Sequence, residues 1–94
     1  MNKEIPKPYK PERHQKGWGF EDWISNGEYC GKLLFFEKGK KCSFHYHERK
    51  HETFYLFSGK MEIKAGFEDD ISTAKSYIFL PGDCLEIPIG LRHQ

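Results

Sequence analysis

Short apolar or alternating runs follow one another from Trp18 onward, separated by turn residues about every eight to twelve positions. An alternating run places every second side chain on one face of a strand, so this spacing is typical of an all-β sandwich or barrel. Strands are predicted at 19–24, 29–37, 41–47, 53–58, 60–65, 76–80 and 84–87. Only residues 70–75 are predicted to be helical, as a single turn capped by an Asp.

The first 16 residues differ from the rest because Pro6, Pro8 and Pro11 lie among charged side chains. We predict an extended arm without its own core over 1–16 and one small domain over 17–94. Net charge is +1 over 94 residues, which gives no general electrostatic case for a nucleic acid or a membrane as partner. We therefore expect neither.

The three cysteines, Cys30, Cys42 and Cys84, are odd in number and widely spaced. Small secreted domains usually carry an even disulfide framework instead. No apolar run is long enough to span a bilayer, and the N-terminal residues lack the apolar core of a signal peptide. These features predict a cytoplasmic protein.

Candidate metal ligands are concentrated in one stretch of the chain. His45 and His47 are two residues apart on a predicted strand and therefore share a face. Glu52 begins the next predicted strand, and antiparallel pairing of the two strands would bring its carboxylate beside the imidazoles. His93 follows a Pro-x-Gly turn that can direct it toward the same cavity. Such groups suit Zn, Mn, Fe, Ni, Co or Cu better than Ca or Mg.

These residues belong to two longer patterns that resemble the two motifs of the cupin superfamily. The first, G-x5-H-x-H-x4-E-x6-G, is matched at Gly39, His45, His47, Glu52 and Gly59. The second, G-x5-P-x-G-x2-H, is matched at Gly82, Pro88, Gly90 and His93. The resemblance implies a double-stranded β-helix barrel of the jelly-roll kind, usually a homodimer. It also implies one divalent metal (Zn, Mn, Fe, Ni or Co) held by His45, His47, Glu52 and His93.

The end of the sequence departs from the cupin pattern. Cupin chains normally continue past the last histidine for one or two strands, whereas this sequence ends at Gln94. Either the polypeptide is a fragment of a longer one, or something else closes the barrel. An open barrel leaves an unpaired strand edge, which favours pairing with another chain. We expect a barrel truncated at its C-terminal end, in which the terminal position of His93 weakens its anchoring.

A finer resemblance is carried by the sequence WGFE at 18–21, Tyr29 with Gly31 and Lys32, and Ser43. These short matches are similar to the cupin domain of type II phosphomannose isomerases, which implies a small-molecule substrate of the sugar or sugar-phosphate class. The reaction would be aldose–ketose isomerisation through an enediolate, with the metal polarising a carbonyl group. The catalytic base is not identified by the sequence, and Lys32 is the candidate.

Substrate-binding candidates lie around the predicted ligands. Ser43 shares a face with His45, and Phe54 and Leu56 follow the predicted carboxylate ligand in phase, so that they would form apolar walls of the cavity. Arg92 is a cation near the expected mouth and could bind a phosphate or a carboxylate.

Two other functions fit the same residues. With iron, the ligand set would bind a substrate and O₂ together, as in a dioxygenase-type cupin. A non-catalytic sugar- or metal-binding module, or a domain of a larger enzyme, is favoured by the missing strands. Cupins support many chemistries, so the fold does not choose among these functions.

Overall fold

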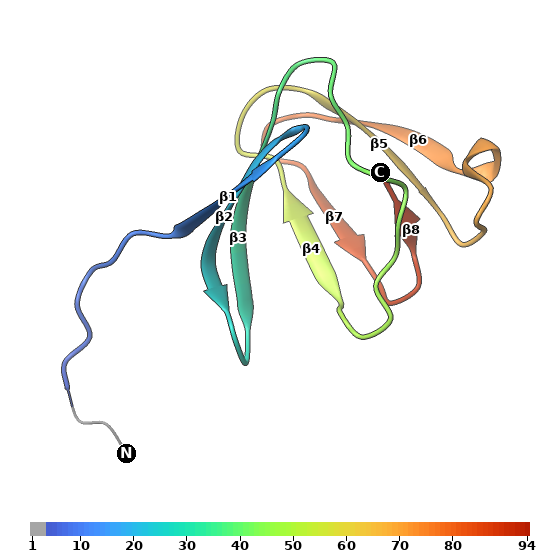
Figure 1. Cartoon of the computed structure of the whole chain (residues 1–94). Helices are drawn as coiled ribbons and strands as arrows, with labels where there is room; N and C mark the ends of the chain where they lie inside the picture. The colour runs from blue at the N-terminus through green and yellow to red at the C-terminus, as the bar shows by residue number, and fades with distance from the viewer. Residues whose placement is uncertain (1–3) are drawn as a thin grey trace. The chain divides into compact units, whose positions relative to one another are not determined.

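The chain is an all-β protein in a computed structural model that describes residues 4–94 (Figure 1). Its strands are β1 (Glu12–Lys16), β2 (Gly19–Asn26), β3 (Cys30–Phe36), β4 (Glu52–Tyr55), β5 (Met61–Gly66), β6 (Lys75–Phe79), β7 (Cys84–Ile87) and β8 (Arg92–His93). They pair into three antiparallel sheets, and within residues 4–94 no sheet closes into a barrel. The predicted all-β class is confirmed, whereas the double-stranded β-helix stays a prediction.

The chain divides into two compact units, Met1–Lys41 and Cys42–Gln94. The expected division into an arm at 1–16 and a domain at 17–94 stays a prediction. In the part of the chain that the structure describes, no helix has the length and apolar character needed to cross a membrane.

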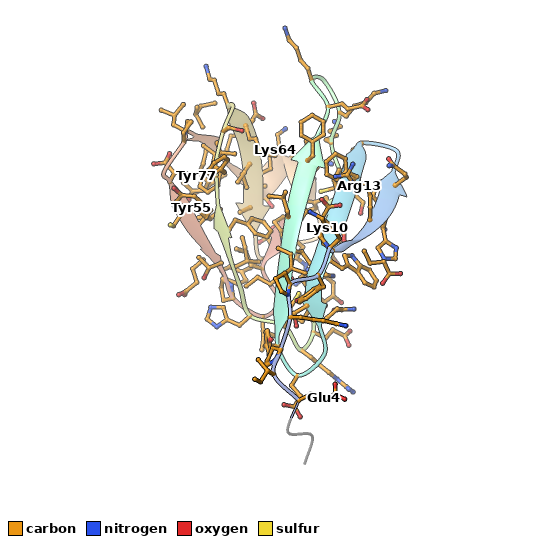
Figure 2. The ribbon with its side chains drawn as sticks, turned by 90° about the vertical axis from the view of Figure 1, so that its left-hand side faces the viewer. Glu4, Lys10, Arg13, Tyr55, Lys64 and Tyr77 are labelled. Carbon is orange, nitrogen blue, oxygen red and sulfur yellow. The ribbon has the colours of Figure 1, made fainter. Side chains whose placement is uncertain are left out.

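The first unit is a three-stranded sheet in the order β1-β2-β3. Strand β1 lies inside the range predicted to be an extended arm, and it pairs with β2 from Glu12 opposite Trp23 to Lys16 opposite Gly19. Its sequence, ERHQK, has no apolar alternation, so hydrophobic periodicity gives no sign of it. Arg13, labelled in Figure 2, fixes the pairing through two hydrogen bonds to Asp22, of 2.8 and 3.0 Å.

The second unit contains a two-stranded sheet, β4-β7, and a three-stranded sheet, β6-β5-β8. The predicted strand at 84–87 is confirmed with the same bounds as β7. The predicted helical turn is a 3-10 helix, Ile71–Thr73, and Asp70 caps it by accepting a hydrogen bond from the backbone N–H of Ser72. Tyr55 of β4 and Tyr77 of β6, both labelled in Figure 2, are exposed on these sheets.

Two small apolar clusters form the core of the second unit. One contains Leu56, Ile63 and Phe79, and the other contains Ala65, Ile87 and Leu91. Phe54 and Leu85 pack against both clusters and so connect them. Strand β4 alternates as predicted, because Phe54 is half-buried while Thr53 and Tyr55 are exposed. The core therefore lies on the face of β4 that also carries Glu52.

The predicted strand at 41–47 is wrong. Within that segment only His45 makes a β-bridge, and its partner is His93. The partner segment explains the interruption, since Pro88 has no N–H to donate and Gly90 turns the chain with a φ of 85°. The ladder cannot extend past this turn, so the histidine-bearing segment stays irregular after His45.

Candidate metal centre

Three imidazoles converge in the second unit. His45 and His47 come from the segment before β4, and His93 ends β8; their ligand nitrogens all lie within 4.8 Å of one another. The ring centroids are 4.4 Å apart for His45 and His93, 5.2 Å for His45 and His47, and 5.4 Å for His47 and His93. The structure thus brings together three of the four ligands predicted from sequence.

Backbone pairing accounts for this convergence. His45 and His93 lie opposite each other in an antiparallel bridge, and each donates its N–H to the carbonyl of the other, at 3.1 and 2.8 Å. Residues paired in this way carry their side chains on the same face. His47, two residues after His45, shares that face, and its carbonyl accepts a hydrogen bond from the N–H of Gly90 at 3.0 Å.

His93 is firmly anchored, contrary to the expectation drawn from its terminal position. It is only 3% exposed, and it pairs with Ala65 of β5 on the side away from His45. The next residue extends this pairing, because Gln94 and Lys64 exchange two backbone hydrogen bonds of 2.9 and 3.1 Å. His93 is therefore held from both sides.

Glu52 lies at the edge of the histidine cluster. It is the first residue of β4, where it pairs with Ile87 of β7, and its Oε2 is 3.4 Å from Nε2 of His47. The approach differs from the one predicted, since β4 does not pair with the segment that carries His45. The turn at 48–51 and the β4-β7 pairing place the carboxylate instead.

Two hydrogen bonds define which ring nitrogens are available. Nδ1 of His45 lies 2.8 Å from the carbonyl oxygen of Ser43, and Nδ1 of His93 lies 3.0 Å from that of Leu91. A carbonyl oxygen only accepts, so each Nδ1 carries the proton and each neutral ring keeps its lone pair on Nε2. Histidines that bind metals are oriented by the same kind of hydrogen bond.

The electrostatic environment favours neutral imidazole at His93. Burial lowers the pKa of His93, and the neighbouring His45 and His47 lower it further. The hydrogen bond to the Leu91 carbonyl and the charge of Glu52 act in the opposite direction, but the net pKa is below its ordinary value. A neutral ring is the form that binds a metal.

The ligand nitrogens of the cluster lie near, but not within, the spacing that a shared ion requires. Zn–N distances are about 2.0–2.1 Å, so two nitrogens bound to one ion lie within about 4.2 Å of each other. The cluster's nitrogens lie within 4.8 Å of one another, so the rings have to move closer for all three to bind one ion. Three imidazoles with an adjacent carboxylate suit Zn, Mn, Fe, Ni or Co, whereas Ca and Mg prefer sites made of oxygen alone.

The substrate-binding candidates of the second unit take different places. The backbone carbonyl of Ser43 accepts the hydrogen bond from Nδ1 of His45, and Ser43 itself is exposed. The ring of Phe54 meets His93 edge-on, with centroids 5.5 Å apart. Leu56 is buried in the core beside Ile63.

The two cations predicted to act on the substrate, Arg92 and Lys32, both contact other groups of the protein. Arg92 contacts Asp69, the Gly90 carbonyl and the ring of Tyr46. Lys32 belongs to the first unit, on β3, where its Nζ lies 3.9 Å from Oε1 of Glu21 and 4.7 Å from the centroid of the Trp23 ring. Neither the carbonyl acceptors of the histidines nor the Arg92 contacts were foreseen from sequence, because spacing gives no sign of either.

Comparison with known proteins does not supply a family. No family model, no curated protein and no solved structure matches the chain. The cupin resemblance therefore rests on the two sequence motifs and stays a prediction.

Proposed function

We propose that the second unit binds one divalent transition metal through His45, His47 and His93, with Glu52 as the fourth ligand. The observation that carries this proposal is the pair of Nδ1–carbonyl hydrogen bonds at His45 and His93. They leave two Nε2 lone pairs within a group of three imidazoles whose ligand nitrogens lie within 4.8 Å of one another.

When bound, such a metal supplies a Lewis acid that polarises a carbonyl or phosphoryl oxygen. The protein's own groups do the rest of the work. Backbone pairing of His45 with His93 fixes the direction of two ligands, and the Phe54 ring packs against the His93 ring at an interplanar angle of 71°. The carboxylate of Glu52 adds negative charge next to His47 and so balances part of the charge of a divalent ion.

The metal site is tested by metal analysis of the purified chain after loading with Zn, Mn, Fe, Ni or Co in turn. We expect one ion per chain, and loss of that ion in His47→Ala and His93→Ala. His51→Ala is the matched control, because His51 is exposed and its Nε2 lies 3.6 Å from Glu86 rather than near the cluster. A chain that takes up none of these metals, or variants that all lose metal equally, would contradict the site.

The sequence resemblance supports a finer form of the proposal. In this form the chain is a cytoplasmic cupin, as a homodimer, and it catalyses aldose–ketose isomerisation of a sugar phosphate. A coupled assay of mannose 6-phosphate and fructose 6-phosphate interconversion, with each metal restored in turn, tests the activity. Turnover with one metal supports the isomerase; no turnover with any metal removes the isomerase and leaves a metal-binding module.

A further inference from the structure

Arg92 lies on the face of β8 opposite to His93, and three groups engage its guanidinium. Its Nε lies 3.0 Å from Oδ1 of Asp69, and its Nη1 donates to the Gly90 carbonyl at 2.7 Å. Its Cζ lies 3.9 Å from the centroid of the Tyr46 ring. Long cationic side chains usually extend into water, yet only 21% of this one is exposed. Arg92 is thus committed to contacts within the protein.

These contacts lie directly behind the histidine cluster. Because His45 is bridged to His93 in antiparallel fashion, Tyr46 and Arg92 occupy the next cross-strand position, on the opposite face. On its other side, Arg92 pairs with Gly66 of β5, and Asp69 follows in the loop after that strand. A single side chain therefore links the histidine segment, β8 and the loop after β5.

The segment that carries His45 and His47 needs such a link: His93 is also paired with β5, whereas this segment is attached to residues 90–93 by three backbone hydrogen bonds, two at His45 and one at the His47 carbonyl. Strand β8 has two residues, and the segment 41–47 joins it through one bridge at His45. Rotation or slippage about this bridge would separate the two imidazoles. A planar guanidinium that stacks on a ring while donating in fixed directions restricts both motions.

We propose that Arg92 is a positioning residue that holds Tyr46 and Asp69 across the outer face of β8 and thereby keeps His45 and His93 in the arrangement that binds the metal. This inference rests on the metal site proposed above. It gives Arg92 a role different from the substrate contact expected from sequence. Simple electrostatics makes the opposite prediction, since removing a nearby cation would strengthen the binding of a divalent ion.

The first test is Co²⁺ titration of the full chain, followed by the ligand-field absorption of the bound ion. We expect Arg92→Ala to weaken Co²⁺ binding about ten-fold, as for other residues that orient metal ligands, and to change the absorption spectrum. Arg92→Lys keeps the positive charge but lacks the planar guanidinium, so its affinity for Co²⁺ should fall between those of Arg92→Ala and the wild type. Arg49→Ala is the matched control: it removes the same charge from an exposed turn and should not weaken binding.

A second pair of variants tests the stacking contact without altering Arg92. Tyr46→Phe keeps the ring face and should bind Co²⁺ like the wild type. Tyr46→Leu removes the ring face and should weaken binding by a smaller factor than Arg92→Ala. This pair keeps the test decisive if Arg92→Ala does not fold, and equal affinities for both Tyr46 variants would then contradict the positioning role.

Amide hydrogen exchange in the metal-free chain provides a readout independent of metal. If Arg92 fixes the bridge, the N–H groups of His45 and His93 exchange faster in Arg92→Ala than in the wild type. If Arg92→Ala shows the amide exchange, Co²⁺ affinity and absorption spectrum of the wild type, the positioning role is overturned. The metal site itself is then unaffected. If the wild type itself fails to bind any metal, the metal site falls, and the exchange rates still decide whether Arg92 holds the bridge.

Discussion

The two units of the chain are stabilised in different ways. All six buried apolar side chains among residues 4–94 lie in the second unit, at Leu56, Ile63, Ala65, Phe79, Ile87 and Leu91. In the first unit, the buried side chain is that of Asp22, and the sheet is held by its ladder and by cross-strand contacts such as the stacking of His14 on Trp23. Each cross-strand pair contributes only about 0.2–1 kcal/mol. The histidine cluster lies in the unit that has the apolar core.

This difference has a physical reason. Metal ligands must be held within a fraction of an ångström, which requires supporting groups that are themselves packed. In the second unit, β5 provides both Ile63 for the core and Ala65 as the partner of His93. Core packing is therefore transmitted through one strand to His93, a ligand of the proposed metal site. The first unit has no equivalent buried apolar support among its described residues.

The largest effect is expected from a change in the core of the second unit. Ile87→Ala removes a side chain that is 1% exposed and should lower the free energy of unfolding by roughly 2–5 kcal/mol. Metal binding should weaken too, because Ile87 is the partner of Glu52 in the β4-β7 pairing. Urea unfolding measures the first effect and metal titration the second. Leu33→Ala, at a β3 residue that is 51% exposed, is the control and should change the free energy by less than about 0.5 kcal/mol.

A glycine substitution tests whether the ladder holds the first unit. A Cβ at Gly19 would lie 1.8 Å from the carbonyl oxygen of Phe35, and the φ of 151° already disfavours other residues. Gly19→Ala should therefore separate β2 from β3 at this end and speed amide exchange in both strands. Gly27→Ala, where a Cβ meets nothing within 4 Å, is the matched control. Equal exchange in the two variants would contradict the importance of this close approach.

A smaller, pH-dependent effect is expected at Asp22. Hydrogen bonds from Arg13 lower the pKa of Asp22, although burial opposes them. A carboxylate with a lowered pKa stabilises the folded state above its unfolded pKa of about 3.9, and this contribution is lost as the pH falls through the folded pKa. Asp22→Asn should therefore destabilise the chain at pH 7 and lose that effect progressively below about pH 4. Unfolding midpoints of both proteins across this range check the sign, and a pH-independent difference would contradict it.

The sequence predicted those parts of the fold that depend on local alternation. Strands β2 to β7 each overlap a predicted run, with bounds that differ by up to three residues, and the Asp cap located the single turn at 71–73. Strand β1 was missed because its residues are polar and its pairing depends on partners in β2. Strand β8 was missed because two residues are too few to show alternation. The strand at 41–47 was wrong because the spacing of His45 and His47 fits a strand, whereas strand formation also requires a continuous partner.

The same distinction applies to the site. The spacing of His45, His47 and Glu52 and the late His93 named the residues of the cluster. It could not reveal the carbonyl groups that fix the imidazole tautomers, because backbone groups leave no trace in the sequence. Nor could it show that Arg92 faces away from the cluster, since that depends on which residue of β8 pairs with His45.

The most direct measurement is ¹⁵N NMR of the histidine side chains during Zn²⁺ titration. In the metal-free chain, we expect protonated Nδ1 and unprotonated Nε2 at His45 and His93, as their carbonyl contacts require. On addition of one equivalent of Zn²⁺, the Nε2 resonances should shift while Nδ1 stays protonated. The opposite tautomers, or Nε2 resonances unchanged by Zn²⁺, would contradict a metal centre at this cluster.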